Sequence, residues 1–216
     1  MNITVEQTLE MPNAALFAEK LKSALEAEAQ KRRRFYEMVD EDKKMEFING
    51  EIVIHSPVKL RHNSATKLLC GLLNAFVVKN NLGFVGVEKI MVSLTRNDYE
   101  PNVCFFGTEK AKNFTPEQLR FPAPDLVVEV LSDSTVKADR ETKFQDYAAH
   151  GVREYWIVDP ERETIEQYSL QNERYELLLK SNSGEVKSVV LPDFQIPIRA
   201  VFDAKTNLEI LSKIIA

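Results

Sequence analysis

Apolar residues recur at helical spacing in four parts of the chain, and each part predicts a helix that buries one face. We expect these helices at about residues 13–38, 60–79, 139–150 and 208–214. Pro12-Asn13 is a start signal for the first helix, and Gly83 and Gly151 follow the second and third, where glycine commonly ends a helix. A short extended piece is expected before the first helix.

Shorter runs rich in β-branched and aromatic residues predict strands. The clearest signal is Asn49-Gly50 between two apolar runs, which is typical of a tight hairpin between antiparallel strands. The run at about 125–132 is apolar on both faces, as in a strand buried within a sheet. The expected strands lie at about 45–48, 51–54, 84–94, 103–106, 125–132, 154–158, 164–170, 175–179 and 186–191.

The order of these elements predicts the architecture. From Leu60 onward the chain runs helix, three strands, helix, strand, and this alternation favours an α/β core with a mixed sheet, followed by extra C-terminal strands. The sequence contains no internal repeat, low-complexity tract or Gly/Ser linker. We therefore expect one domain at residues 45–216, preceded by an N-terminal extension at residues 1–44 with one helix.

Composition limits the possible partners. The 216-residue chain is 44% hydrophobic, enough to bury a core, and its 28 Lys and Arg against 33 Asp and Glu give a net charge of -5. This balance argues against disorder and against a uniformly basic surface for nucleic acid. An anionic partner would need local basic patches, and the candidates are Lys31–Arg34, Lys43-Lys44, and Arg61 with Lys67.

The sequence also predicts the compartment. No stretch approaches the roughly 20 continuous apolar residues that cross a bilayer, and the N-terminus lacks the apolar core of a signal peptide. Cys70 and Cys104 both lie in apolar surroundings, which favours free buried thiols over a disulfide or a metal pair. These features together predict a cytoplasmic protein without membrane contact.

Glu129 is the most informative residue, because it interrupts an otherwise apolar strand. An ionised carboxylate is costly to bury unless something compensates its charge. A structural salt bridge, a metal ligand and a catalytic acid all satisfy this requirement. Lys143 is the nearest cation that could reach it, since it lies at the margin of the inward face of the next helix, although it could equally be solvated.

Asp125 lies on the same face of this strand as Glu129, four residues earlier. Four residues of strand span about 13 Å, so one ion cannot easily bind both carboxylates. Asp125 is a second candidate catalytic acid at the strand entrance, or it caps a neighbouring loop.

Other polar residues give weaker signals. Glu46 and Glu51 flank the hairpin turn, where acidic side chains are usually exposed. His55 and His62 lie near a strand end and a helix start, without the spacing of a zinc motif.

A set of motifs across about residues 45–202 resembles the Uma-two family, a branch of the PD-(D/E)xK nuclease superfamily with the restriction-endonuclease-like fold. The predicted core order is also that of the superfamily. The motifs are Met45-Glu46-Phe47-Ile48-Asn49-Gly50-Glu51-Ile52, Ser56-Pro57, His62, Pro101-Asn102-Val103, Pro124-Asp125 to Glu129-Val130-Leu131-Ser132, Lys143 with Tyr147, Gly151-Val152-Arg153-Glu154-Tyr155-Trp156 to Asp159-Pro160, and Leu191-Pro192-Asp193-Phe194.

The resemblance implies cleavage of DNA phosphodiester bonds with Mg²⁺ or Mn²⁺. An acid on the second core strand and the Glu of the third would hold the metal, while a lysine orients or polarises the attacking water. Glu129 matches that Glu, and Lys143 matches the displaced lysine of this branch, since Leu131 stands where the common pattern has lysine.

One departure from the family pattern concerns the metal. The second-strand motif is normally Pro-Asp-Val, whereas this chain has Asn102 between Pro101 and Val103. The amide oxygen of Asn102 can still coordinate a metal, but the site loses one negative charge. The candidates for supplying that charge are Asp125, Glu51 and Glu88.

Two functions follow from the resemblance and the departure. One is an active Mg²⁺-dependent endodeoxyribonuclease. The other is a nuclease-fold module that lost its chemistry through Asn102 and binds nucleic acid or protein. A purely structural role for the acids is a third interpretation. A homodimer is expected only by analogy with restriction enzymes.

Overall fold

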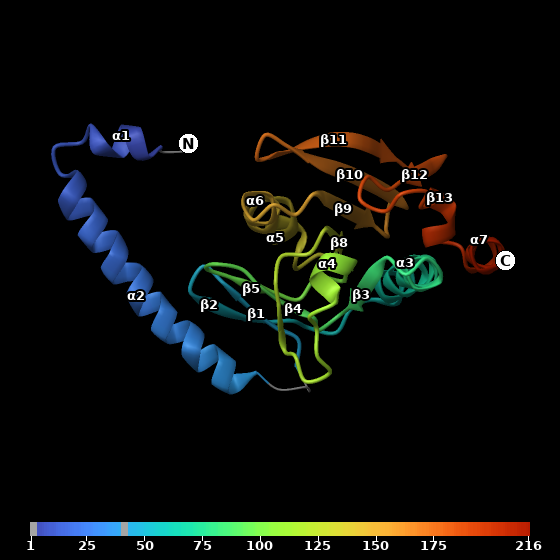
Figure 1. Cartoon of the computed structure of the whole chain (residues 1–216), viewed down its shortest axis with the longest axis horizontal. Coiled ribbons are helices and arrows are strands. Elements are labelled where there is room, and N and C mark those ends of the chain that lie inside the picture. The colour runs from blue at the N-terminus through green and yellow to red at the C-terminus, as the bar shows by residue number, and fades with distance from the viewer. Residues whose placement is uncertain (1–3, 40–42) are drawn as a thin grey trace.

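The computed structural model describes residues 4–39 and 43–216, and it consists of an α/β body with a long helix projecting along its flank (Figure 1). The helices are α1 (Val5–Leu9), α2 (Ala14–Met38), α3 (Leu60–Lys79), α4 (Thr108–Ala111), α5 (Val136–Arg140), α6 (Thr142–Ala149), η1 (Ile198–Val201, 3-10) and α7 (Ala204–Ile215). Helix α1 lies at the outer end of the projecting arm, on the opposite side of the molecule from α7.

A six-stranded sheet forms the centre of the body, in the order β11-β10-β9-β8-β6-β3. Strands β8 and β9 are parallel, whereas all other neighbours are antiparallel, so the sheet is mixed as predicted. Its strands are β3 (Gly83–Val87), β6 (Val103–Gly107), β8 (Leu126–Val130), β9 (Glu154–Asp159), β10 (Thr164–Gln171) and β11 (Arg174–Ser181).

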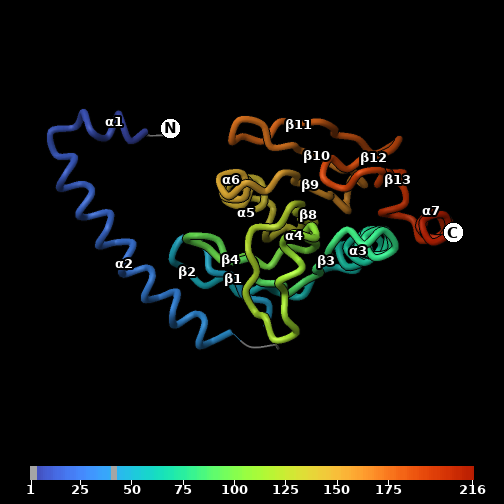
Figure 2. Tube along the Cα trace, viewed as in Figure 1, coloured from blue at the N-terminus to red at the C-terminus, as the bar shows by residue number. Residues whose placement is uncertain are grey.

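Helices cover both faces of this sheet, with α3 and α6 on opposite sides of β8 and β9 (Figure 2). Successive residues of a strand face opposite sides. Val128 accordingly packs in the cluster that contains Leu69 and Leu73 of α3, while Val127 packs with Tyr147 of α6. Because Glu129 lies two residues after Val127, its side chain faces the α6 side of the sheet.

A second sheet of five short strands lies beside the first, in the order β2-β1-β5-β4-β7. The predicted hairpin joins β1 to β2, with positive φ at Asn49 (52°) and Gly50 (84°), as this kind of turn requires. These strands are β1 (Met45–Ile48), β2 (Glu51–Ile54), β4 (Met91–Ser93), β5 (Asp98–Tyr99) and β7 (Arg120–Phe121), and β12 (Glu185–Lys187) pairs separately with β13 (Gln195–Pro197).

The predicted core order is confirmed. From α3 the chain contributes β3, β6 and β8 to the central sheet, then helices α5 and α6, then β9. Strands β4, β5 and β7 lie between these core elements in sequence but belong to the second sheet. The fold is therefore an α/β restriction-endonuclease-like core with a mixed sheet and additional C-terminal strands.

Several predicted elements differ in detail. The strand expected at 84–94 bends at Glu88 and Lys89, whose φ angles of 42° and 43° are left-handed, and its halves join different sheets. The helix expected at 139–150 is divided into α5 and α6 at Glu141, whose ψ of -76° interrupts the helix. The expected initial extended piece is instead the short helix α1, because Thr4 and Gln7 form a capping box.

Helix α2 packs on the body through its C-terminal half. Phe35 is fully buried against Met45 and Phe47, and Arg32 forms an ion pair with Asp98 at 2.6 Å. The N-terminal half has a largely exposed apolar stripe on the same helical face, which consists of Phe17, Leu21 and Leu25.

Glu154 shows how a buried acid is stabilised within this core. Its side chain is fully buried at the start of β9 and accepts hydrogen bonds from the Trp156 indole (2.7 Å) and the Gln167 amide (2.7 Å). It also accepts from the Ser188 hydroxyl and from two backbone N–H groups that follow it. These last bonds bend the chain after β12, so the strand expected to reach residue 191 ends at Lys187.

Candidate active site

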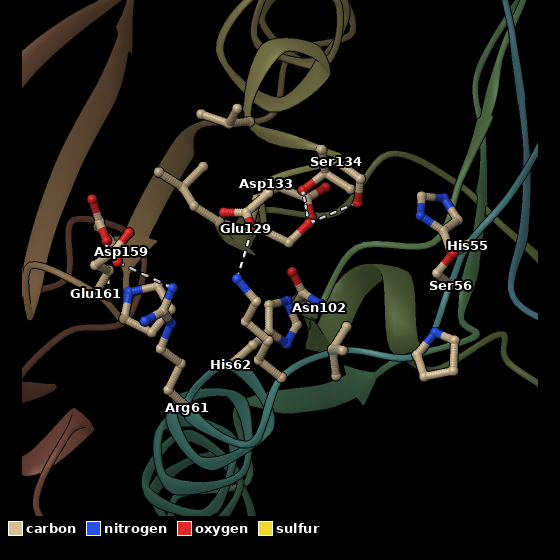
Figure 3. A pocket seen from close by; sticks show the side chains of 18 of the residues that line it. His55, Ser56, Arg61, His62, Asn102, Glu129, Asp133, Ser134, Asp159 and Glu161 are labelled. Carbon is tan, nitrogen blue, oxygen red and sulfur yellow. Dashed lines mark hydrogen bonds and ion pairs between the residues drawn. The ribbon is translucent and has the colours of Figure 1, made fainter.

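A pocket of about 410 Å³ opens beside the C-terminal end of β8 and the first turn of α3 (Figure 3). Polar and charged side chains line most of it, and Glu129 and Lys143 lie at its base. The lining residues are Lys44, His55, Ser56, Pro57, Val58, Lys59, Arg61, His62, Asn102, Glu129, Leu131, Ser132, Asp133, Ser134, Thr135, Val136, Lys143, Asp159, Pro160, Glu161 and Arg162.

Lys143 reaches Glu129, as the sequence predicted, but it also meets two further acids. Its Nζ lies 2.9 Å from Glu46 Oε1 and 3.1 Å from Glu129 Oε1. The third carboxylate is Asp139, whose Oδ1 is 3.2 Å from the same Nζ. All four side chains are at most 3% exposed. We call these four residues the Lys143 cluster.

The elements of the fold explain why these side chains meet. Glu129 faces α6 from the middle of the central sheet, and Lys143 comes from the first turn of α6. Asp139 lies four residues before Lys143, on α5. Glu46 comes from β1 in the second sheet. The cluster therefore joins the two sheets and the helices between them.

The charges in the cluster do not balance, since three carboxylates surround one ammonium group. Burial raises the pKa of Glu129, and Asp139 and Glu46 add to that rise against the attraction of Lys143. Burial alone would also raise the pKa of Glu46, but Lys143 and His55 outweigh it and hold that pKa below its usual range. Burial opposes the charge of Lys143, yet the carboxylates raise its pKa well above the ordinary value. Of Glu129 and Glu46, Glu129 is therefore the one that takes up a proton more readily.

The expectation that Glu46 is exposed is wrong. Its Oε2 lies 2.9 Å from His55 Nε2, and its Oε1 accepts a hydrogen bond from the Glu100 backbone at 2.8 Å. Strand β1 lies between β2 and β5, so Glu46 faces the interior although it is close to a turn. Glu51, at the start of the edge strand β2, is exposed as expected.

Asn102 lies on the pocket wall, and both ends of its amide have partners. The side-chain oxygen Oδ1 accepts a hydrogen bond from the Val130 backbone N–H at 2.7 Å. The nitrogen Nδ2 donates to Glu88 Oε1 at 2.8 Å. An aspartate would present its second oxygen where this nitrogen lies. The substitution therefore replaces one possible metal ligand by a donor, and it pairs that donor with Glu88.

Asp125 lies at the opposite end of β8 and does not join the pocket. It accepts a hydrogen bond from the Gly107 backbone at 2.8 Å, and it forms ion pairs with Lys110 (3.1 Å) and Arg153 (3.2 Å). These contacts outweigh burial and lower its pKa. Asp125 thus caps a loop, which was the second of the two roles expected for it. Its distance from Glu129 along the strand, about 13 Å for four residues, keeps it out of the pocket.

The possible metal ligands form a sparse set. Within residues 4–39 and 43–216, no three Asp, Glu, His or Cys side chains converge on a point where they could hold a metal ion. Mg²⁺ commonly binds one or two carboxylates and completes its coordination with water and substrate phosphate oxygens. The Glu129 carboxylate and the Asn102 amide oxygen both lie at the pocket. They fit a site of this kind in which the protein supplies a single carboxylate and one amide oxygen.

Comparisons with known proteins show the family to which the chain belongs. A family model, Uma2, described as "Putative restriction endonuclease", matches residues 32–199. The chain belongs to the Uma2 family. The "Uncharacterized protein sll1609" of Synechocystis sp. is 28% identical to this Uma2 protein over 148 residues, which cover 67% of this chain and 83% of that relative.

A solved structure shares the fold of this Uma2 protein. It is the crystal structure of a putative nuclease belonging to DUF820 from Anabaena variabilis, with a TM-score of 0.67 and 17% sequence identity. The match covers 78% of this chain and 94% of that chain. Membership of an endonuclease family and this fold together place the protein among nuclease-like proteins.

The basic segments of this Uma2 protein are largely engaged with its own acids. Lys31 pairs with Glu51 at 3.2 Å, and Lys44 pairs with Glu88 at 2.7 Å. Arg61, at the pocket mouth, pairs with a carboxylate at 3.2 Å. Cys70 and Cys104 are free thiols. Within the described residues, no helix has the length and apolar character needed to cross a membrane.

Sequence reasoning missed Glu46 and Asp139 as members of the cluster. It noted His62 as a weak metal candidate and as one of the family motifs but gave it no role, yet this side chain lines the pocket and is 4% exposed. Two signals pointed to Glu46: it belongs to the first family motif, and it interrupts an apolar run, as Glu129 does in β8.

Proposed function

We propose that this protein is a divalent-metal-dependent endonuclease that hydrolyses DNA phosphodiester bonds in the pocket above Glu129. The observation that supports this most directly is the buried Glu129–Lys143 pair at the base of an accessible pocket. A buried acid with a raised pKa at a cleft is characteristic of a functional site. Family membership supplies the reaction class.

Glu129 and Asn102 are the residues that would hold Mg²⁺ or Mn²⁺. When bound, such an ion neutralises charge on the phosphate and lowers the pKa of a coordinated water. Lys143 lines the pocket, but its ammonium group already has three carboxylate oxygens within 3.2 Å. We therefore assign Lys143 the role of positioning the Glu129 carboxylate and limiting its uptake of protons.

The test is nicking of supercoiled plasmid DNA in Mg²⁺, in Mn²⁺ and in EDTA. We expect metal-dependent nicking by the natural protein and none by Glu129→Gln, which keeps the shape of the side chain and removes its charge. Glu51→Gln is the matched control, because Glu51 is an exposed acid that does not line the pocket. Absence of nicking with either metal contradicts the proposal, as does full activity in Glu129→Gln.

A second function is favoured by one specific observation, the hydrogen bonds of Asn102. Because Nδ2 takes the position of a second carboxylate oxygen, the site has one ligand and one negative charge fewer than the family pattern. A nuclease-fold protein that binds nucleic acid without cutting it would show no nicking until aspartate is restored. Activity only in Asn102→Asp would support this second function, and activity in both proteins would eliminate it.

We also propose that a second copy of the chain covers the exposed stripe of α2. Leu21 lies two heptads before the buried Phe35, so the stripe continues the face by which α2 already packs on the body. Light scattering after gel filtration should give a dimer mass, and Leu21→Gln should reduce it to the monomer mass. Leu177→Gln, at another exposed leucine, is the control. A monomeric natural protein contradicts this proposal.

The expected cytoplasmic compartment also stays a prediction, which rests on the two free thiols.

A further inference from the structure

The first turn of α3 lies at the pocket and is open to a ligand. This helix has 20 residues and begins at Leu60, after Lys59 as its N-cap. Among the described residues, no side chain caps this end of the helix. The first N–H groups of an α-helix have no acceptor within the helix, and together with the helix dipole they favour anions.

A second, independent observation points to a ligand at the same place. His62, in this first turn, is 4% exposed and lines the pocket. Its Nδ1 is buried and has no hydrogen-bond partner among the described residues. A buried polar atom without a partner costs about 1–3 kcal/mol, so such an atom beside an open pocket indicates a position where a ligand completes the bonding. Figure 3 shows His62 beside Asn102, below Glu129.

Two cations flank the same turn, and within the part of the chain that the structure describes each pairs only with an exposed carboxylate. Lys59 Nζ lies 2.6 Å from Asp133, and Arg61 lies 3.2 Å from Glu161. The side chains of the first pair are 63% and 76% exposed. Exposed ion pairs contribute about 0–1 kcal/mol, so a phosphate can displace these carboxylates at little cost. Arginine suits a phosphate best, because its guanidinium group can bind two oxygens.

We propose that the first turn of α3 is a phosphate-binding subsite for the nucleic-acid backbone. The backbone N–H groups of Leu60 and Arg61 contact the phosphate oxygens together with the Arg61 and Lys59 side chains, since the next two N–H groups already donate to the Lys59 carbonyl. His62 Nδ1 donates to the phosphate or to an adjacent sugar oxygen. This inference rests on the proposed function, since the phosphate bound here belongs to the strand whose scissile bond lies above Glu129. The subsite holds the strand in register while Glu129 and Asn102 face the neighbouring phosphate.

The experiment measures binding and cleavage separately. A fluorescein-labelled single-stranded oligodeoxynucleotide is titrated with full-length protein in EDTA, and anisotropy is recorded over a series of salt concentrations. Arg61→Ala is compared with Lys79→Ala, which removes one charge from the exposed C-terminal end of the same helix. We expect Arg61→Ala to weaken binding about tenfold and to reduce the slope of log affinity against log salt by about 0.7, the value for one phosphate contact on a single strand. Lys79→Ala should stay within about twofold of the natural protein.

A second readout follows the histidine itself. The chain has 3 histidines, so imidazole NMR signals can be assigned by substitution. The His62 signals should move when the oligonucleotide is added in EDTA, and His62→Gln should identify them. A parallel titration with inorganic phosphate distinguishes the backbone of a strand from a free phosphate as ligand.

Each outcome decides the inference. Equal affinity of Arg61→Ala and Lys79→Ala, or His62 signals that do not move with the oligonucleotide, overturns it. Signals that respond to inorganic phosphate alone also overturn it, because the ligand would then be a free anion. Plasmid nicking is measured on the same proteins in Mg²⁺ and Mn²⁺. Arg61-dependent binding without nicking would refute the proposed function alone, and nicking without that dependence would refute only the subsite.

Discussion

Removal of the central ammonium group gives the sharpest test of the Lys143 cluster. Lys143→Met keeps an unbranched side chain of similar length and deletes the charge that lies within 3.2 Å of three buried carboxylates. Breaking a buried ion pair by removing one partner typically costs about 3–5 kcal/mol, because the remaining charge is left without compensation. We expect a loss of stability in this range at pH 8.

The stability loss caused by Lys143→Met should depend on pH, and the pKa of Glu129 determines the direction of this dependence. In the natural protein burial already raises the pKa of Glu129, and without Lys143 the weaker attraction of Lys44 is left to oppose that rise. Between the ordinary carboxyl pKa and the raised one, the folded state binds protons that the unfolded state does not. Stability therefore falls as pH rises through this window. The loss caused by Lys143→Met should be smaller near pH 5, where only the stabilisation of ionised Glu46 is lost, and should grow towards pH 8, where Glu129 must ionise as well.

The assay is urea unfolding followed by fluorescence of Trp156, which is fully buried and is the only tryptophan of the chain. With an m-value of about 3 kcal/mol/M, the expected loss lowers the midpoint by about 1–2 M at pH 8. Lys79→Met is the control for loss of an exposed charge. A midpoint that is unchanged at pH 8, or a loss that is equal at pH 5 and pH 8, would refute the reasoning about uncompensated carboxylates.

Three further predictions concern single side chains. Glu129→Gln should change the free energy of unfolding at pH 7 by less than about 1 kcal/mol, because burial already disfavours the charge of Glu129. Loss of nicking with intact stability would then separate a catalytic role from a structural one. Asn102→Asp places a carboxylate against Glu88 and should lower the melting temperature without metal. Mn²⁺ should raise the melting temperature of this variant more than that of the natural protein, and equal responses would contradict a ligand role for residue 102. Glu154→Leu leaves several buried donors without an acceptor and should cost at least about 3 kcal/mol in urea unfolding, against a change below about 1 kcal/mol for the exposed Glu51→Leu.

The sequence predicted the Glu129–Lys143 pair because two periodicities pointed to it. Strand alternation placed Glu129 on a buried face, and helical spacing placed Lys143 at the margin of the facing side of the next helix. The core order followed from the same periodicities, since long helices and apolar strands give strong signals. Family motifs then added Asn102 to the same site.

The rest of the site depends on contacts between distant segments. Glu46 is separated from Lys143 by nearly one hundred residues, and no local pattern states that β1 becomes an inner strand of a second sheet. Asp139 lay at a predicted helix start, where acids are ordinarily solvated. The missing partner of His62 Nδ1 is visible only when every neighbour of that atom is placed.

The arrangement of the Lys143 cluster also determines when the pocket can exist. Glu46 is synthesised early. Lys143, which neutralises it, belongs to α6 and is synthesised much later. A nascent chain that has not yet supplied that helix cannot bring the hairpin and the central sheet together around these charges. The pocket therefore lacks part of its lining until translation has passed both α6 and the Asp159–Arg162 turn.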